Sequence, residues 1–178
     1  ACEYARLKNI PYFGICLGMQ IALIEFARNM LDLKGANSTE FDSKTNYPVV
    51  ALIVEWKDKN GKTERRTADS DLGGTMRLGG QACILKKGSN VFRMYKKKEI
   101  VERHRHRYEV NPEFRDGFNT KGMNIVGTSV DDMLVEMIEI QNHPWFLGCQ
   151  FHPEFTSNPR DGHPIFNSFI SSTIKTKK

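Results

Sequence analysis

A single cysteine stands between two glycines near the beginning of the chain, in residues 14–18. The mostly apolar residues 10–15 predict a strand, and an apolar helical pattern begins at Leu17. A nucleophile held at a sharp strand-to-helix turn has this spacing, with flanking glycines removing Cβ atoms that would clash there. We therefore expect Cys16 to be a nucleophile. Its place at a helix N-terminus should lower the pKa of its thiol.

A cysteine nucleophile needs a base, and His152 has the most suitable position among the five histidines. It follows the apolar run 145–151, so it should lie at the C-terminal end of a central strand, where open α/β sheets build their sites. Glu154 comes two residues later, and in an extended chain residues i and i+2 point to the same side. A carboxylate there can fix the imidazole tautomer. The spacing predicts that Cys16, His152 and Glu154 act together.

Composition and charge set the broad class of the protein. A chain of 178 residues is most simply one domain, spanning 1–178. No apolar run approaches the roughly 18 residues of a membrane span, and no signal peptide is visible, so we expect a cytoplasmic protein. Four widely spaced cysteines without a C-x-x-C pair argue against a zinc site or a disulfide scaffold, and we expect no metal. The net charge of +5 is only a weak sign of polyanionic partners.

Hydrophobic periodicity predicts an α/β fold with an open, mostly parallel sheet flanked by helices and extended by antiparallel strands. A helix is expected from Leu17 to about residue 35, a loop over 36–47, and a hairpin turn at Asn60 and Gly61. Strands are expected at 49–56, 62–67, 75–78, 82–85, 100–110, 124–128, 134–140 and 145–151, and further helices at 89–95 and 163–174.

Residues 14–20 and 151–154 together resemble the triad class of glutamine amidotransferase domains. The stretches 36–40, 73–79, 102–110 and 151–162 are more specific, and resemble the C-terminal amidotransferase domain of the bacterial-type CTP synthase family. The resemblance covers essentially the whole chain and implies a flavodoxin-like class I amidotransferase fold. It also implies a domain truncated at its N-terminus, without its first strands and without a synthase domain.

The resemblance assigns roles to individual residues. Cys16 would attack the carboxamide of glutamine and form a glutamyl thioester, with His152 moving protons and Glu154 orienting it. The backbone N–H of Leu17 would be one oxyanion donor, and the second donor, in an upstream glycine loop, is expected to be missing. The residues implied in glutamine binding are Leu17, Gly18, Met19, Gln20, Glu40 for the α-ammonium, and Arg107 for the α-carboxylate. Alternation places Arg103, Arg105 and Arg107 on one face, so position alone does not choose among them.

The resemblance further implies partners outside these residues. Ammonia would pass to a synthase domain of the same polypeptide, which uses ATP and Mg²⁺ to aminate UTP, with GTP as an allosteric activator and a homotetrameric assembly. No cofactor is expected in this domain itself, and no phosphate-binding P-loop occurs in the sequence. The glycine-rich segment 73–80 and the loop at Arg65 and Arg66 are candidates for facing the activator or the synthase domain.

Two alternatives stay open. The first is the glutaminase part of another triad amidotransferase, such as GMP synthetase or carbamoyl phosphate synthetase, although the stretches 36–40, 73–79 and 102–110 argue against it. The second is a nucleic-acid-binding domain that uses residues 103–107 and lysine runs at 86–87, 96–98 and 175–178. The basic residues lack the interleaved aromatic platform that single-strand binding uses, which weakens the second alternative.

Overall fold

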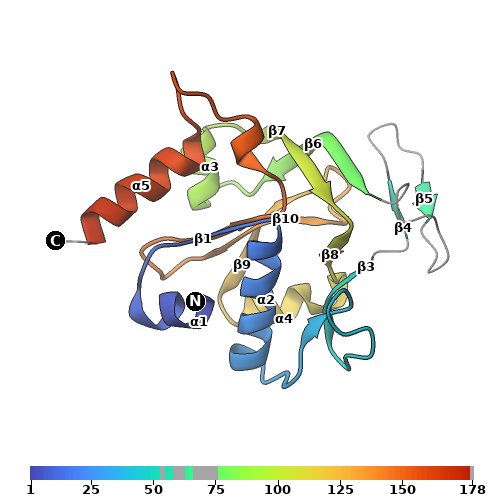
Figure 1. Cartoon of the computed structure of the whole chain (residues 1–178). Helices are drawn as coiled ribbons and strands as arrows, with labels where there is room; N and C mark the ends of the chain where they lie inside the picture. The colour runs from blue at the N-terminus through green and yellow to red at the C-terminus, as the bar shows by residue number, and fades with distance from the viewer. Residues whose placement is uncertain (53–54, 58–62, 66–75, 177–178) are drawn as a thin grey trace.

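A six-stranded sheet forms the centre of the computed structural model, which describes residues 1–52, 55–57, 63–65 and 76–176 (Figure 1). Its strand order is β1-β11-β10-β9-β6-β7. The strands are β1 (Tyr12–Ile15), β6 (Arg77–Leu85), β7 (Glu99–His106), β9 (Met123–Thr128), β10 (Val135–Ile140) and β11 (Phe146–Cys149). Strand β6 is continuous where the sequence predicted two strands, because Gly79 adopts a φ of 83° within it and pairing with β7 continues through Gly79 and Gly80.

The strand directions differ from the prediction. Strands β1 and β11 run parallel, whereas the other four pairings of this sheet are antiparallel. The α/β class with an antiparallel extension is confirmed, but the prediction of a mostly parallel sheet is wrong for the residues described. The connections explain the difference: β9, β10 and β11 follow one another through short turns at residues 129–134 and 141–145, and short turns can join only antiparallel neighbours.

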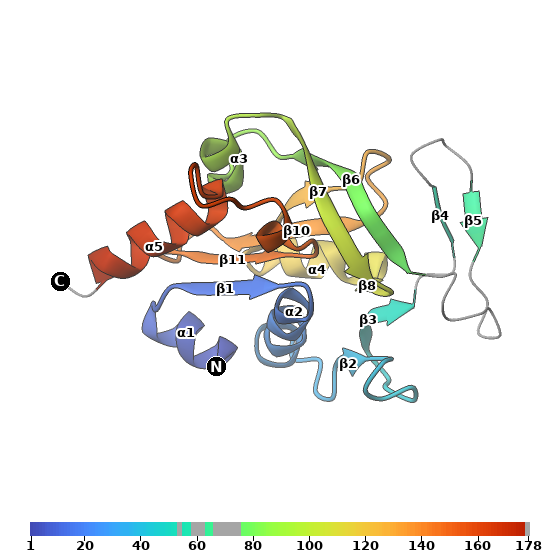
Figure 2. The same ribbon diagram turned by 45° about the horizontal axis from the view of Figure 1, so that its top comes forward.

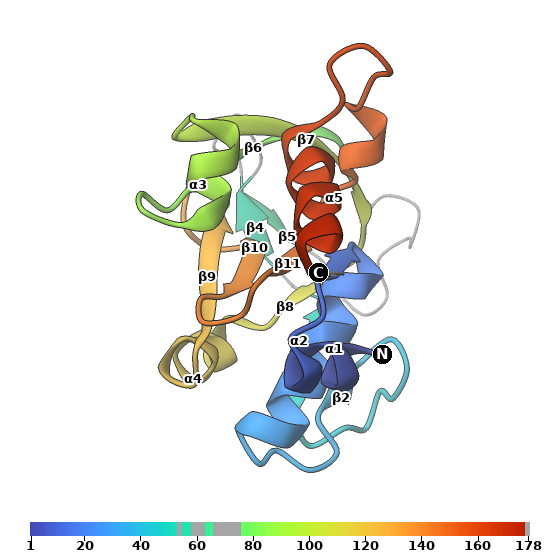
Figure 3. The ribbon, with the colours of Figure 1, turned by 90° about the vertical axis from the view of Figure 1, so that its left-hand side faces the viewer.

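Helices cover both faces of the sheet. Helices α1 (Cys2–Lys8), α2 (Leu17–Met30) and α4 (Arg115–Thr120) lie on one side, and α3 (Asn90–Tyr95) and α5 (Pro164–Thr176) on the other (Figures 1 and 3). Each side has its own apolar core, built around Phe26 and Phe118 on the first and around Phe151 and Ile165 on the second. In the described part of the chain, no helix is long and apolar enough to cross a membrane.

The short helices differ in how well the sequence indicates them. Helix α3 was expected, and Ser89 caps it by accepting a hydrogen bond from the N–H of Phe92 at 3.1 Å. Helices α1 and α4 were not expected, because 7 and 6 residues are too few for a periodic pattern. The 3₁₀ turns η1 (Pro112–Phe114) and η2 (Pro153–Phe155) each begin with a proline.

A second, three-stranded sheet lies beside α2 (Figure 2). It contains β2 (Asn37–Ser38), inside the stretch predicted to be a loop, and β3 (Pro48–Leu52) and β8 (Tyr108–Val110). The single strand predicted over 100–110 is therefore two strands in two sheets. Strand β7 pairs with β6 as far as His106, the chain bends at Arg107, and β8 then pairs with β3 through Val50 and Val110.

Strands β4 (Glu55–Lys57) and β5 (Thr63–Arg65) pair in antiparallel register, which confirms the strand pairing of the predicted hairpin. The predicted turn at Asn60 and Gly61, together with Arg66 and the glycine-rich stretch 73–75, lies outside the described residues.

Candidate active site

Cys16 occupies the turn between β1 and α2, as predicted. Its φ of 51° and ψ of −106° are a backbone conformation that non-glycine residues rarely adopt, the strained geometry of a nucleophile elbow. Gly14 makes the turn possible, because a Cβ there would lie 2.6 Å from the backbone carbon of Gly18. Gly18 itself has room, since its Cβ would meet only the Tyr12 hydroxyl at 3.9 Å. The expectation that both glycines relieve a clash therefore holds only for Gly14.

The groups around the Cys16 thiol shift its pKa in opposite directions. Burial raises its pKa above the usual range, and the carboxylates of Glu109 and Glu154 add to this effect. The backbone N–H of Leu17 and the side-chain amide of Gln150 lower it by hydrogen bonding to the sulfur. The expectation of a lowered pKa is thus wrong in direction, because removal of the sulfur from water outweighs the nearby donors. A base is therefore needed to form the thiolate.

His152 and Glu154 lie at the edge of the sheet that also carries Cys16. Parallel pairing of β1 with β11 places Ile15 beside Cys149, and the N–H of Cys16 donates to the Cys149 carbonyl at 2.7 Å. The chain reaches His152 three residues later. The Nδ1 of His152 lies 2.7 Å from the Glu154 carboxylate, while its buried Nε2 has no hydrogen-bond partner within the described residues. This ring nitrogen is available to accept a proton.

A cavity of about 230 Å³ opens beside Cys16. It gathers residues from four separate parts of the chain: the start of α2, the turn after β2, the residue before β6, and the junction of β7 and β8. The lining residues are Cys16, Leu17, Gln20, Glu40, Met76, Arg105, His106, Arg107 and Tyr108. The cavity thus brings a thiol, an acidic side chain and two arginines together, a set that matches the functional groups of an α-amino acid amide.

Only some of the predicted substrate-binding residues line this cavity. Leu17, Gln20, Glu40 and Arg107 line the cavity, whereas Gly18 and Met19 do not. Met19 is fully buried under the sheet, where its side chain would leave no space for a Cβ on Gly148. The carbonyl of Gly18 accepts a hydrogen bond from the Tyr12 hydroxyl at 2.7 Å. Both residues therefore shape the elbow rather than the wall of the cavity.

The structure also separates the three arginines that alternation placed together. Arg103 and Arg105 lie on the exposed face of β7, opposite the buried Glu102, His104 and His106. Arg107 lies beyond the end of β7, at the bend between the sheets. Arg105 and Arg107 line the cavity; Arg103 does not, and its carbonyl accepts the N–H of His152 at 2.8 Å.

A buried ion cluster adjoins the cavity through His106. The guanidinium of Arg77 lies 3.1 Å from Glu109 and 2.7 Å from Glu136, and His106 Nε2 lies 2.8 Å from Glu109. Although burial opposes it, His106 and Arg77 hold the pKa of Glu109 at about 2. These residues come from β6, β7, β8 and β10, so the cluster ties the two sheets together. No spacing in the sequence indicates it, because its members pair only after the sheets form.

Glu102 anchors the segment that carries His152 and Glu154. Its carboxylate accepts hydrogen bonds from the hydroxyls of Thr156 at 2.6 Å and Tyr95 at 2.8 Å, and lies 2.9 Å from Nε2 of His163. The backbone N–H of Thr156 donates to the Pro153 carbonyl at 3.2 Å. The carboxylate therefore holds the turn η2 against β7, a role that sequence reasoning did not foresee.

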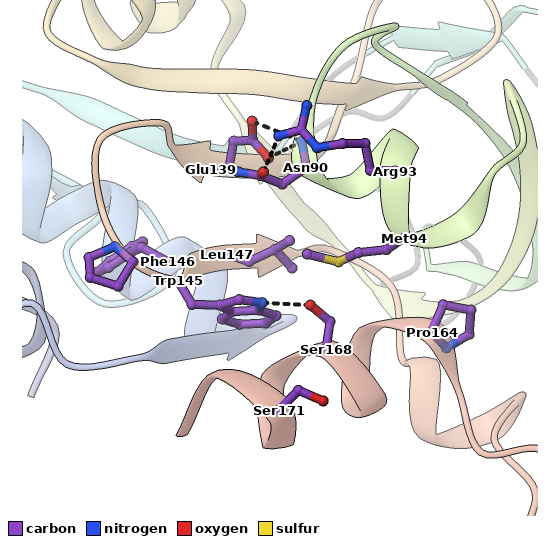
Figure 4. A pocket seen from close by; sticks show the side chains of 11 residues that line it. Asn90, Arg93, Met94, Glu139, Trp145, Phe146, Leu147, Pro164, Ser168 and Ser171 are labelled. Carbon is purple, nitrogen blue, oxygen red and sulfur yellow. Dashed lines mark hydrogen bonds between the residues drawn. The ribbon is translucent and has the colours of Figure 1, made fainter. Parts of the chain in front are cut away.

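A larger cavity of about 450 Å³ lies at the other end of β11, between α3 and α5 (Figure 4). Its carboxylate, Glu139, accepts the N–H of Asn90 at 3.0 Å and so caps α3, and the indole of Trp145 donates to Ser168 at 2.9 Å. Its polar groups are engaged in holding the fold. Among the described residues, no group of three or more His, Cys, Asp or Glu side chains could hold a metal ion.

Comparison with solved structures shows what this geometry is similar to. The glutaminase domain of Trypanosoma brucei CTPS with bound acivicin superposes with a TM-score of 0.84 at 35% identity, covering 98% of this chain. This chain spans 64% of that relative's length. The structure of a GMP synthase component from Thermoplasma acidophilum gives a TM-score of 0.58 at 19% identity, with 99% of this chain and 63% of that one covered, which shows likeness of fold alone.

A family model supports the same assignment over nearly the full sequence. The model of glutamine amidotransferase class-I matches residues 1–172. The strand-to-helix turn at Cys16 and the His152–Glu154 pair lie within this match. The chain belongs to the class-I glutamine amidotransferase family.

Proposed function

We propose that this chain is the glutaminase part of a CTP synthase, hydrolysing L-glutamine to glutamate and ammonia. The observation that carries the proposal is the cavity in which Cys16 lies together with Glu40 and Arg107. The likeness at 35% identity to a CTPS glutaminase domain with bound acivicin, a glutamine analogue, supports it.

The arrangement suits the binding of glutamine by its two ends. Arg107 offers a planar guanidinium to the α-carboxylate, and the exposed carboxylate of Glu40 offers a counter-charge to the α-ammonium. The side-chain carboxamide then points to the sulfur of Cys16. Because the amino acid is held at its charged end, its carboxamide carbon is positioned beside the sulfur before the reaction begins.

The chemistry proceeds through a covalent intermediate. His152 takes the thiol proton at Nε2 while Glu154 stabilises the imidazolium, and the sulfur attacks the carboxamide carbon to form an S–C bond. The N–H of Leu17 stabilises the oxyanion. The C–N bond breaks as His152 returns the proton, and ammonia leaves. Water then attacks the thioester, His152 takes its proton, the S–C bond breaks, and glutamate and the thiol are restored.

The ammonia is proposed to serve a synthase domain of the same polypeptide. That domain would use ATP and Mg²⁺ to aminate UTP to CTP, with GTP as activator and a homotetramer as the working assembly. These steps belong to pyrimidine nucleotide biosynthesis, so we place the protein in the cytoplasm.

Substitution of Cys16 by alanine in the full-length protein tests the proposal. Cys16→Ala should abolish glutamine-dependent formation of CTP, while CTP formation from added ammonium salt should continue, because only the nitrogen source is lost. The ammonium-dependent reaction of the same preparation is the control, because it shows that the variant protein is folded. Loss of both activities would contradict the division of labour between the two domains.

Product analysis separates CTP synthase from other amidotransferases of this family. With glutamine and ATP present, UTP should be aminated and xanthosine monophosphate should be left unchanged. Amination of xanthosine monophosphate instead would favour a GMP synthetase, whose fold the Thermoplasma structure represents.

Labelling identifies the nucleophile. A glutamine-analogue electrophile should modify Cys16 and spare the buried Cys2, Cys83 and Cys149, as measured by peptide mass mapping.

A further inference from the structure

The side chain of Gln150 contacts the nucleophile but takes no part in the proposed mechanism. Gln150 directly follows β11 and is fully buried, and its Nε2 lies 3.6 Å from the sulfur of Cys16. Its own N–H donates to the Glu136 carbonyl at 2.8 Å, so the pairing of β10 with β11 fixes its position. A buried amide is costly unless its polar atoms are paired, so this contact is part of a built arrangement.

The direction of this amide is set by a relay of hydrogen bonds. The backbone carbonyl of Tyr108 can only accept, and Gln20 Nε2 donates to it at 2.9 Å. The same nitrogen donates its second hydrogen to Gln150 Oε1 at 3.1 Å. Gln150 must therefore present its oxygen to Gln20 and its N–H group to the sulfur. Because the relay begins at an acceptor that cannot be reversed, the polarity at its far end is fixed.

The relay also connects two parts of the cavity. Tyr108 follows Arg107, the proposed contact of the substrate carboxylate, and the relay ends at Cys16, the proposed nucleophile. An N–H donor stabilises a thiolate more than a neutral thiol, since hydrogen bonds to charged acceptors are the stronger ones.

We propose that Gln150 is a positioning residue for the nucleophile: its amide, oriented by Gln20 and the Tyr108 carbonyl, holds the Cys16 sulfur in the elbow and stabilises its thiolate. The catalytic consequence rests on the proposed glutaminase function. The hydrogen bond to the sulfur does not, so the two can be tested separately.

The titration of Cys16 in the full-length protein, without glutamine, tests the contact. The rate of Cys16 alkylation by iodoacetamide is followed against pH, with peptide mapping to identify the modified residue and thermal unfolding to verify the fold. Gln150→Met keeps the side-chain length and removes the donor. The midpoint of the pH profile should rise by about 0.5–1 unit, the equivalent of one hydrogen bond to a charged group. A folded Gln150→Met protein with the wild-type midpoint would overturn the proposal.

A change at the start of the relay tests it from the other side. Gln20→Met removes the donor without adding a charge, so Gln150 is no longer held with its oxygen away from the sulfur and the midpoint should rise, although Gln20 makes no contact with the sulfur. Gln141→Met, on an exposed turn beyond β10, is the control for the same substitution and should leave the midpoint unchanged. Equal midpoints for Gln20→Met and Gln141→Met would refute the relay.

Activity measurements then link the relay to turnover. In Gln150→Met, kcat for glutamine hydrolysis should fall by about tenfold with KM nearly unchanged, because the residue acts on the sulfur and not on the substrate. A raised KM with an unchanged kcat would assign Gln150 to substrate binding and contradict the proposal. If the wild-type protein shows no glutaminase activity while the alkylation midpoints shift as expected, the proposed function fails and the relay stands.

Discussion

At the scale of single residues, the Cys16 thiol shows how burial and hydrogen bonding compete. Its pKa is raised because the sulfur is withdrawn from water, although two donors lie against it. The sulfur therefore rests mainly as a thiol at neutral pH, and in the proposed mechanism His152 removes the proton at the moment of attack. The free Nε2 of His152 is consistent with that dependence.

Arg107 and Arg103 provide a matched pair for testing substrate binding. Arg107→Ala should raise KM for glutamine by about tenfold or more with a smaller effect on kcat, because a charge-assisted contact to the α-carboxylate exists in the ground and transition states alike. Arg103→Ala, which removes an exposed arginine outside the cavity, should leave KM close to the wild-type value. Steady-state kinetics with glutamine as the varied substrate give both values.

An unchanged KM in Arg107→Ala would move the carboxylate contact to Arg105, which also lines the cavity.

The local geometry of the site could be predicted where it has a local sequence pattern. The glycine spacing around Cys16 and the His-x-Glu spacing of 152–154 are local patterns, and both are reproduced in the elbow and in the 2.7 Å contact. Gln150 and the Arg77 cluster have no such pattern. The contact of Arg77 with Glu109 joins residues 32 positions apart and that of Gln150 with Cys16 joins residues 134 positions apart, so only the assembled sheet reveals them.

At the scale of elements, the turn from β1 to α2 depends on one glycine more than on the other. Gly14→Ala should destabilise the protein by at least about 2 kcal/mol, in the range of overpacking by a group that cannot be moved, because the new Cβ meets the backbone of Gly18 at 2.6 Å. Gly18→Ala should cost less than about 1 kcal/mol, since its Cβ meets nothing closer than 3.9 Å. Urea unfolding of the two variants measures the difference.

Equal destabilisation by the two substitutions would show that the elbow relaxes around Gly14 and that the close approach does not constrain it.

Element prediction worked for segments with a strong periodic or apolar pattern. The strands at β9, β10 and β11 and the helices α2, α3 and α5 were all expected near their observed positions. The break at Arg107 was not, because neither glycine nor proline marks it between residues 99 and 110, and only pairing with β3 ends the first strand and begins the second. Whether a strand runs parallel or antiparallel likewise depends on the strands with which it pairs.

At the scale of the whole molecule, stability should depend on pH through His104. Burial, reinforced by Arg77, lowers the pKa of His104 to about 2 in the folded protein, whereas the unfolded chain has an ordinary value near 6.5. The unfolded state takes up a proton as the pH falls below 6.5 and the folded state does not. The stability that His104 confers is therefore complete above pH 6.5 and is lost progressively toward pH 2.

Between pH 7 and pH 5 this single group should reduce the free energy of unfolding by about 2 kcal/mol. His104→Gln removes the titration, so the difference in unfolding free energy between the two pH values should shrink by about that amount relative to the wild type. Urea unfolding at both pH values gives the comparison. The same pH difference in variant and wild type would mean that His104 titrates normally in the folded state.

The two sheets contribute different residues to the candidate active site. The six-stranded sheet presents Cys16 and His152, while Glu40 comes from the turn after β2 in the smaller sheet, and Arg107 lies where the chain crosses between them. In the proposed function, bond breaking and the choice of amino acid therefore depend on different sheets of the protein. An engineer who rebuilt the 39–47 turn could change which amide the pocket accepts without redesigning the sulfur chemistry, and natural divergence has the same freedom.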